Sequence, residues 1–331
     1  MSSITSLSTE TTELLVVGAG PIGIACGVEA RRVSLEHLIF DRGALTNSLC
    51  RFPRNLVWFS TSELLEVGGI PLICSGAKPT GPEVIRYYHR VAEHHQLAVR
   101  LYEEVESIEP QGPGDFTVRT AKRVVRCRAV VLATGFFDHP NLLNCPGEDL
   151  SKVEHYYDGP YLYYGQRVAV IGGGNSAVEA ALELYRNGAA EVTLIHRGKE
   201  LSHRIKYWQK PDIENRIKEG SIRSFFDAEL ERIDEKEITL RDCDGKAVRL
   251  ANDFVLALTG YHADFEFIKR MGVRIDSESL KPDYNPETME TNVPGLYCAG
   301  VIVGGKDSGS IFIENSRVHA RKIVKHVVRG K

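Results

Sequence analysis

Short apolar runs that lead directly into glycines recur along the chain and predict its architecture. The first covers residues 14–23, and a second of the same kind covers residues 167–177. A short apolar run followed by a glycine turn and a helical period is typical of a buried parallel strand that turns into a helix. Two more apolar runs, at 130–135 and 254–260, each end in Thr-Gly. The chain therefore repeats one unit, and we expect an α/β fold that contains this unit twice.

The first glycine cluster has the residue types that bind a dinucleotide. Gly18 permits the tight turn, Gly20 lets the backbone approach a pyrophosphate, and Gly23 allows close packing of helix and strand. The helix that opens near Pro21 would hold phosphate on its N–H groups, because the helix dipole favours anions there. Asp41 ends the next predicted strand, where its carboxylate can accept hydrogen bonds from ribose hydroxyls. The cluster therefore predicts a dinucleotide site.

The second glycine cluster differs at the end of the strand that follows it. Gly172, Gly174 and Ser176 form a turn of the same kind, but the next predicted strand ends in His196 and Arg197 instead of an acid. Basic side chains there suit the 2′-phosphate of NADP, whereas an acid suits NAD or FAD. The alternative is that both are solvated residues at a strand end. The residues expected to bind this second nucleotide are Gly172, Gly174, Asn175, Ser176, His196, Arg197 and Arg204.

The order of the elements indicates that one domain is inserted into the other. Residues 136–164 are rich in proline, glycine and tyrosine, a composition shift that marks a boundary. The C-terminal part, with a strand at 296–300 and a helix from about 308 to 328, is too small to form a domain and should complete the first one. We therefore predict two dinucleotide-binding (Rossmann-like) domains. Their predicted bounds are 1–139 with 260–331 for the first and 140–259 for the inserted one.

Composition agrees with an ordinary globular protein of about two domains. The 331 residues are 43% hydrophobic and 26% charged, with a formal net charge of −3. This charge gives no reason to expect nucleic acid, and no apolar segment approaches the length of a membrane span. Residues 1–13 are rich in Ser and Thr and lack the apolar core of a secretion signal, so we expect a disordered tail and a cytoplasmic protein.

Cysteine spacing excludes several kinds of site. The seven cysteines contain no Cys-x-x-Cys pair, and their number is odd. This argues against a disulfide framework, a zinc knuckle and a built-in redox dithiol of the usual spacing. We predict no metal site, while a pairing of cysteines distant in the sequence stays open.

As a set, the motifs resemble the low-molecular-weight thioredoxin-reductase-like flavoproteins over nearly the whole chain. The matching motifs are Gly18-x-Gly20-x-x-Gly23 with Asp41, Ala133-Thr134-Gly135, Gly172-x-Gly174-x-x-Ala177 with His196-Arg197, and Leu296–Gly300. The resemblance implies that the first domain (1–139 and 260–331) binds FAD, that the inserted one (140–259) binds NADPH, and that the protein forms a homodimer or a higher homo-oligomer. The residues implied to bind FAD are Gly18, Gly20, Pro21, Ile22, Gly23, Asp41, Arg42, Asn47, Ser48, Ala133, Thr134, Gly135, Gly300 and Val301.

Within that family, the closer resemblance is to the bacillithiol-disulfide reductase branch. Stretches 59–63, 257–262, 299–302 and 312–315 resemble that branch, including Val301 in place of the aspartate usual in flavin reductases. The resemblance implies hydride transfer from NADPH to FAD and then reduction of a low-molecular-weight disulfide. The dithiol of thioredoxin reductase is absent, because the corresponding stretch 155–159 contains no cysteine.

The branch places its proposed redox cysteine inside the first glycine cluster, where this chain has Ile22. A cysteine at that helix N-terminus would have a lowered pKa and react as a thiolate, which isoleucine cannot do. Cys26, one helical turn further on, and Cys50, in the loop after the second strand, are the candidate catalytic residues. For each, the alternative is a cysteine without a catalytic role. Two other functions therefore stay open: cysteine-independent electron transfer to a ferredoxin- or flavodoxin-type carrier protein, and a slow flavoprotein NADPH oxidase or sensor.

Overall fold

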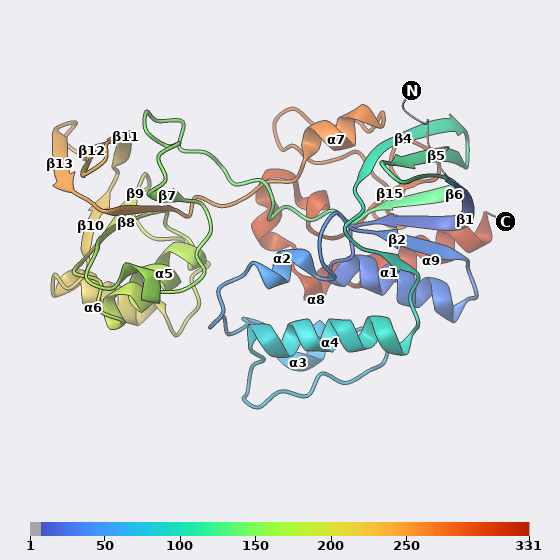
Figure 1. Cartoon of the computed structure of the whole chain (residues 1–331), viewed down its shortest axis with the longest axis horizontal. Helices are drawn as coiled ribbons and strands as arrows, with labels where there is room; N and C mark the ends of the chain where they lie inside the picture. Colours follow the sequence, from blue (N-terminus) through green and yellow to red (C-terminus); the bar gives the residue numbers. More distant parts are fainter. Residues whose placement is uncertain (1–7, 331) are drawn as a thin grey trace, which may run out of the picture. The chain divides into compact units, whose positions relative to one another are not determined.

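The computed structural model describes residues 8–330, and packing divides them into two units (Figure 1). The first unit comprises 8–50, 57–139 and 262–330, and the second comprises 51–56 and 140–261. Each contains a sheet with several parallel strands together with helices, which confirms the predicted α/β class. No helix among residues 8–330 is both long and apolar enough to span a membrane.

The first unit contains a seven-stranded sheet with strand order β3-β2-β1-β6-β5-β4, and β15 pairs with β6. Strands β3, β2, β1, β6 and β15 run parallel, whereas β4, β5 and β6 pair antiparallel. The C-terminal β15 thus joins the sheet that the N-terminal part begins. The strands are β1 (Ser8–Val17), β2 (His37–Phe40), β3 (Val99–Arg100), β4 (Val105–Gly112), β5 (Asp115–Thr120), β6 (Arg123–Leu132) and β15 (Leu296–Cys298).

Two of these strands are longer than the sequence suggested. Residues 8–13, expected in a disordered tail, form the first half of β1 and pair with β6. The sequence did not indicate a strand here because these residues are mostly polar. An ion pair between Glu10 and Arg123 also links this part of β1 to β6. That prediction is therefore wrong for residues 8–13, and residues 1–7 lie outside the described chain. Likewise, the apolar run that starts at residue 130 is only the last part of a continuous strand, β6, which begins at Arg123.

Helix α1 follows the first glycine turn and packs against β1, β2, α4 and α9. The helix predicted from about 308 to 328 is instead divided into three pieces, η2, α8 and α9. Phe312 has extended backbone (φ −121°, ψ 173°), so the chain leaves helical geometry there and α8 starts anew. The helices of this unit are α1 (Pro21–Arg32), α2 (Asn47–Cys50), α3 (Ser62–Leu65), α4 (Gly81–His94), α7 (Phe265–Arg270), η2 (Gly300–Ser310), α8 (Ile313–Ser316) and α9 (Val318–Arg329).

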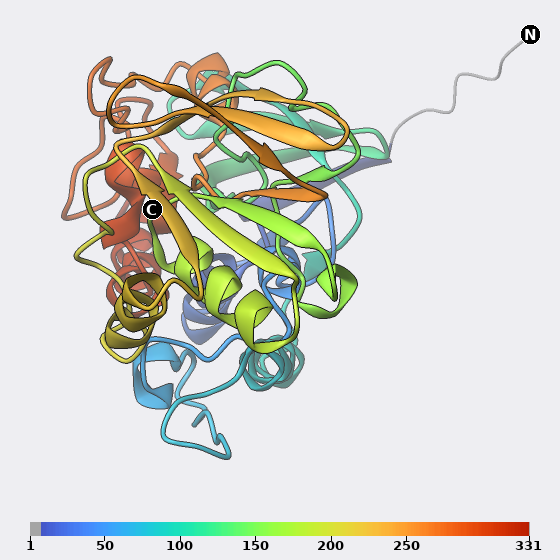
Figure 2. The same cartoon turned by 90° about the vertical axis from the view of Figure 1, so that its left-hand side faces the viewer.

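The second unit has a five-stranded parallel sheet of order β10-β9-β8-β14-β7 and an antiparallel sheet of three strands. Val168 and Val170 pack with α5 and α6, whereas Ala169 and Ile171 pack with the three-stranded sheet, as alternation along β8 requires. Figure 2 shows the helices on one face of the parallel sheet and the three-stranded sheet on the other. The elements are β7 (Val153–Glu154), η1 (Tyr161–Tyr163), β8 (Arg167–Ile171), α5 (Asn175–Arg186), β9 (Glu191–His196), α6 (Lys210–Lys218), β10 (Arg223–Phe226), β11 (Glu229–Ile233), β12 (Glu237–Arg241), β13 (Ala247–Ala251) and β14 (Phe254–Ala257).

The segment Arg51–Leu56 belongs to the second unit although it follows α2 of the first. The Arg51 guanidinium lies 4.3 Å from the centroid of the Tyr156 ring, and Arg54 forms an ion pair of 3.2 Å with Asp158. The sequence predicted only a loop after the second strand here. Side-chain contacts between residues about 100 positions apart therefore extend the second unit beyond its continuous stretch.

Candidate cofactor sites

In the glycine turn after β1, a side chain would have space at Gly20 but would collide with the backbone at Gly18 and Gly23. Gly18 has φ 107°, and a Cβ atom there would lie 2.3 Å from Ala133 O. A Cβ atom on Gly23 would lie 1.8 Å from Gly18 O, so neither position admits a larger residue. Among the described residues, no heavy atom lies within 4 Å of a Cβ position built on Gly20, the N-cap of α1. The turn therefore has the space and the helix N-terminus that a pyrophosphate needs.

Asp41 follows β2 with both carboxylate oxygens oriented by the main chain. Ala19 N donates to Oδ2 at 2.7 Å, and Gly43 N donates to Oδ1 at 2.8 Å. Burial raises the pKa of Asp41, while these two N–H bonds act in the opposite direction. Each oxygen retains a lone pair that can accept a ribose hydroxyl. The neighbouring Arg42 is paired with Asp138 at 2.7 Å, so its guanidinium is held next to this carboxylate.

The loop from Asp41 to α2 is fastened to the same turn. Thr46 is fully buried, and its N–H donates to Ala19 O at 3.0 Å. The predicted residues Asn47 and Ser48 form the first turn of α2. A Cβ atom on Gly43 would lie 2.5 Å from Asn47 Oδ1, so the amide packs directly on the backbone beside Asp41. The structure thus brings the first predicted group of FAD residues together at the carboxyl ends of β1 and β2.

The segment after β6, Ala133–Gly135, lies beside this turn. Ala133 N donates to Val17 O at 2.8 Å, and Gly135 has φ 72°. Thr134 Oγ1 is buried and has no hydrogen-bond partner among the described residues. A buried hydroxyl without a partner is unfavourable, so Thr134 indicates a polar group that binding supplies. A flavin cofactor, which carries hydroxyls, carbonyls and phosphates, fits this donor and the open glycine turn.

Gly300 and Val301 follow β15 at the same edge of the sheet. Gly300 has φ 79°, and a Cβ atom there would lie 3.2 Å from Ile22 Cγ1. Gly300 N donates to His319 Nδ1 at 3.2 Å, so the imidazole holds the start of η2 in place. Burial, with a smaller contribution from Lys322, lowers the pKa of His319 to about 4. No pattern around His319 indicated this contact in the sequence, because the bond joins α9 to a residue 19 positions away.

The two candidate cysteines lie in different environments. Cys26 is fully buried in α1, and burial raises the pKa of its thiol to about 12, which favours a structural role. Cys50 is exposed at the end of α2, with its Sγ 3.9 Å from both Leu45 O and Thr46 Oγ1. All seven cysteines are free thiols. The described residues contain no group of three or more His, Cys, Asp or Glu side chains placed to share a metal ion.

The second glycine turn has the same arrangement as the first. Gly172 has φ 145°, and a Cβ atom there would lie 2.4 Å from Leu258 O. Within the described chain, no heavy atom lies within 4 Å of a Cβ position on Gly174, the N-cap of α5. Ser176 lies in the first turn of α5 and is exposed. This turn therefore also offers a phosphate the start of a helix and an unobstructed backbone.

Asn175 connects the second turn to the loop that carries Arg204. Its Nδ2 donates to Arg204 O at 3.0 Å, and its Oδ1 accepts from Lys206 N at 2.8 Å. Lys206 is buried and forms an ion pair of 2.9 Å with Glu179 on α5. Asn175 is therefore engaged by the protein, and its role is to hold Arg204 close to the glycine turn.

His196 and Arg197 lie at the end of β9, next to the same turn. A Cβ atom on Gly173 would lie 2.5 Å from His196 Nε2, so the imidazole covers the glycine backbone. Burial, followed by the charge of Arg197, lowers the pKa of His196 below 6.5. The imidazole is therefore neutral at pH 7, and Arg197, which is exposed, carries the positive charge. Arg197 and Arg204 are the two arginines that the sequence predicted to bind a 2′-phosphate, and both lie in this unit.

Two glycine turns on parallel sheets, one with an oriented acid and one with arginines, define a nucleotide-binding oxidoreductase of the two-dinucleotide type. A family model described as pyridine nucleotide-disulphide oxidoreductase matches residues 15–300. The chain belongs to this family. It is accordingly a flavoprotein reductase that depends on a pyridine nucleotide, and the cofactors of the family are FAD and NADPH.

Several known proteins are similar to this chain over most of its length. Bacilliredoxin reductase Bdr of Bacillus subtilis is 38% identical over 315 residues, which are 95% of this chain and 97% of that protein. The structure of bacillithiol disulfide reductase Bdr from Bacillus cereus has a TM-score of 0.94 and 37% identity, with 97% of this chain and 100% of that chain covered. A ferredoxin–NADP reductase of Paraburkholderia xenovorans is 28% identical over 298 residues, covering 88% of this chain and 80% of that protein.

Proposed function

We propose that the chain is a cytoplasmic reductase that uses NADPH to reduce a low-molecular-weight disulfide of the bacillithiol type. The reaction balances as NADPH + H⁺ + RSSR → NADP⁺ + 2 RSH. The observation that carries this proposal is the likeness of the whole fold to bacillithiol disulfide reductase, at a TM-score of 0.94. The bound FAD would accept the hydride from NADPH and pass two electrons on.

In this proposal the two units divide the cofactors between them. The first unit holds FAD, with the pyrophosphate on the turn from Gly18 to Gly23 and the ribose on Asp41. Thr134 and the Gly300–Val301 segment contact the remaining parts of the flavin. The second unit holds NADPH, with the pyrophosphate at Gly174 and Ser176. Arg197 and Arg204 pair with the 2′-phosphate, since two cations favour a dianionic group there.

The disulfide is reduced without a thiol in the first glycine turn, because Ile22 occupies the position next to Gly300. Cys50 is the sulfur proposed to take part, since it is exposed and lies on the same short helix as Asn47 and Ser48. Its thiolate would attack the disulfide and release one RSH after protonation. Two electrons from the reduced cofactor would then cleave the mixed disulfide and release the second. Cys26 stays out of this scheme because its thiol is buried and protonated.

The test is NADPH consumption by the purified flavoprotein with bacillithiol disulfide as the acceptor. We expect consumption that depends on the disulfide, and a large loss of rate for Cys50→Ser. Cys243→Ser is the matched control, because Cys243 is also exposed but lies in the second unit. Activity that survives in Cys50→Ser would show that Cys50 is not the sulfur that takes part.

Electron transfer to a ferredoxin-type carrier is the second candidate, and it is favoured by the 28% identity to a ferredoxin–NADP reductase. Cytochrome c reduction that requires added ferredoxin, without any response to bacillithiol disulfide, would establish it. If NADPH bleaches the flavin and no acceptor exceeds oxygen, the chain is a slow oxidase or sensor instead.

We also propose that the protein is at least a homodimer, as its resemblance to thioredoxin-reductase-like flavoproteins implies. Light scattering of the purified chain on a sizing column tests this: a mass near twice 36.8 kDa or above supports it, and a single-chain mass contradicts it. Fractionation of the source cells tests the cytoplasmic location.

A further inference from the structure

Three neighbouring parallel strands of the first unit end side by side. Val17 of β1 is in register with Phe40 of β2, and Phe40 is in register with Arg100 of β3. Ligands of open α/β sheets bind beyond the carboxyl ends of such strands. The glycine turn follows β1 and Asp41 follows β2, so a dinucleotide that sets its pyrophosphate and ribose there extends its base toward the end of β3.

Tyr102 lies two residues after β3 and has two features that are unfavourable for a tyrosine. Its ring is exposed (69%), so it buries little apolar surface in this unit. Its backbone has φ 53°, in the left-handed region that large side chains avoid. Strained residues of this kind persist where surrounding contacts impose them, and they concentrate at ligand sites.

Main-chain hydrogen bonds tie Tyr102 to the turn that carries the ribose acceptor. Tyr102 N donates to Gly43 O at 3.1 Å, and Glu103 N donates to Asp41 O at 2.9 Å. Gly43 N in turn donates to the Asp41 carboxylate. The tyrosine is therefore held at a fixed place next to Asp41, within the same loop cluster.

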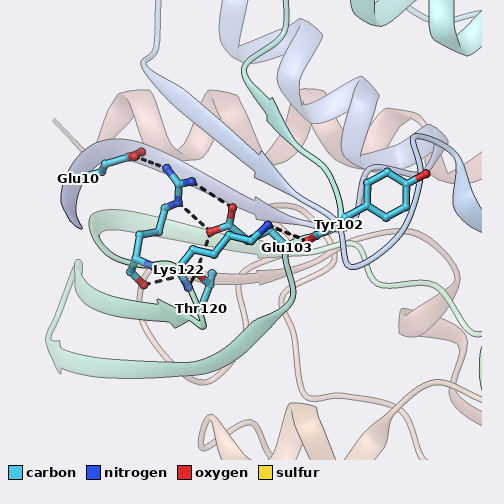
Figure 3. A network of polar contacts seen from close by, with 6 residues as sticks. Glu10, Tyr102, Glu103, Thr120 and Lys122 are labelled. Atoms are coloured by element: carbon cyan, nitrogen blue, oxygen red, sulfur yellow. Dashed lines mark hydrogen bonds and ion pairs between the residues drawn. The ribbon is translucent and has the colours of Figure 1, made fainter. Parts of the chain in front are cut away.

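A buried carboxylate behind Tyr102 imposes its conformation (Figure 3). Glu103 is 4% exposed and accepts hydrogen bonds of 2.7 Å from Thr120 Oγ1 and Arg123 Nε. Lys122 Nζ donates to Tyr102 O at 3.1 Å. In Figure 3 the ring of Tyr102 points away from this network, while its backbone is part of it. The contacts thus fix the backbone and leave the face of the ring open.

We propose that the ring of Tyr102 forms one wall of the adenine site of FAD and stacks on the base. This inference rests on the proposed binding of FAD by the first unit. An aromatic ring at the end of β3 suits a purine, since stacking on a base is favourable and needs no hydrogen-bond pattern. The residue acts in binding, and the network around Glu103 positions it.

The test is FAD affinity of the apoprotein, measured by the change of flavin fluorescence on binding. Tyr102→Gly removes the ring and also relieves the left-handed strain, so the apoprotein should unfold at the same or a higher temperature. We expect its dissociation constant for FAD to rise about tenfold, as for the loss of one base–aromatic stack. Asparagine tolerates the same left-handed backbone, so Tyr102→Asn should show a similar rise in the dissociation constant for FAD. Tyr102→Phe should bind FAD as the wild type does.

Ser34→Gly is the matched control, because Ser34 is an exposed left-handed residue (φ 52°) of the same unit. It should leave FAD affinity unchanged. Unchanged affinity in both Tyr102→Gly and Tyr102→Asn would overturn the assignment of Tyr102 alone. A wild-type chain that takes up no FAD at all would instead overturn the proposed function on which the assignment rests.

Discussion

Ile22 and Gly300 lie against each other, with the Cβ position of Gly300 only 3.2 Å from Ile22 Cγ1. Ile22 stands in the first turn of α1 and is 9% exposed, so its side chain fills the space between the glycine turn and the segment after β15. The residue at this position therefore decides whether the first glycine turn itself carries a thiol. In this chain Ile22 leaves that turn without one.

Ile22→Cys is expected to increase disulfide reduction. A cysteine at a helix N-terminus has a lowered pKa, and a value near 7 instead of 8.5 raises the thiolate fraction at neutral pH by about tenfold. We predict a rise of similar size in the rate of NADPH consumption with bacillithiol disulfide. Ile22→Ser is the control, since it removes the same apolar contact without adding a thiol. Equal rates for the two variants would show that the disulfide does not reach this position.

Asp41→Asn should lower both the affinity for FAD and the free energy of unfolding. The two N–H groups of Ala19 and Gly43 both donate to the carboxylate, and an amide offers them only one acceptor. One buried N–H then loses its partner, which costs about 1–3 kcal/mol of unfolding free energy. The measurements are flavin content after purification and the denaturation midpoint. Glu104→Gln, at an exposed carboxylate near Arg42, is the control and should change neither. A yellow, fully stable Asp41→Asn protein would contradict the role given to Asp41.

Arg197→Ala should change nucleotide preference without changing the fold. Loss of a charged hydrogen bond to the 2′-phosphate should raise KM for NADPH about tenfold or more and leave KM for NADH as it was. Arg223→Ala provides a matched control: Arg223 is also an exposed arginine of the same sheet, but it faces Glu191 and Phe225. If Arg197→Ala raises KM for NADPH and for NADH by the same factor, Arg197 is not the partner of the 2′-phosphate.

The hydrogen bond from Gly300 N to His319 Nδ1 predicts a pH dependence of stability. Burial lowers the pKa of His319 from 6.5 to about 4 in the folded chain, so folding favours the neutral imidazole. Its contribution is complete above pH 6.5 and is lost as the pH falls toward 4, because the unfolded chain then binds the extra proton. His319→Asn keeps an acceptor and cannot titrate, so its denaturation midpoint should fall less over this range. Parallel profiles for the two proteins would contradict this.

The spacing of residues along the chain was sufficient to predict those parts of the fold in which backbone sterics allow only one residue type. Gly18 and Gly23 could be predicted because a Cβ atom at either position would collide with backbone oxygens, so only glycine allows the turn. The α/β class followed from the apolar runs before these turns. The role of Asp41 was inferred from its place at a strand end, and its geometry supports that role.

Contacts between distant segments could not be predicted in this way. The first half of β1 is polar and becomes a strand only because β6 pairs with it. His319 meets Gly300 through the packing of α9, and Tyr102 meets Gly43 through the pairing of β3 with β2. Each of these contacts depends on the tertiary arrangement of distant segments, so the neighbouring residues in the sequence do not indicate it.

The most direct test of the account is an anaerobic two-step experiment on the purified flavoprotein. NADPH is first added until the yellow flavin absorbance is bleached, and bacillithiol disulfide is then mixed in under the same conditions. We predict that the disulfide restores the yellow absorbance within the turnover time, with two thiols formed for each NADPH consumed. Absorbance that stays bleached until oxygen or ferredoxin is admitted would contradict it.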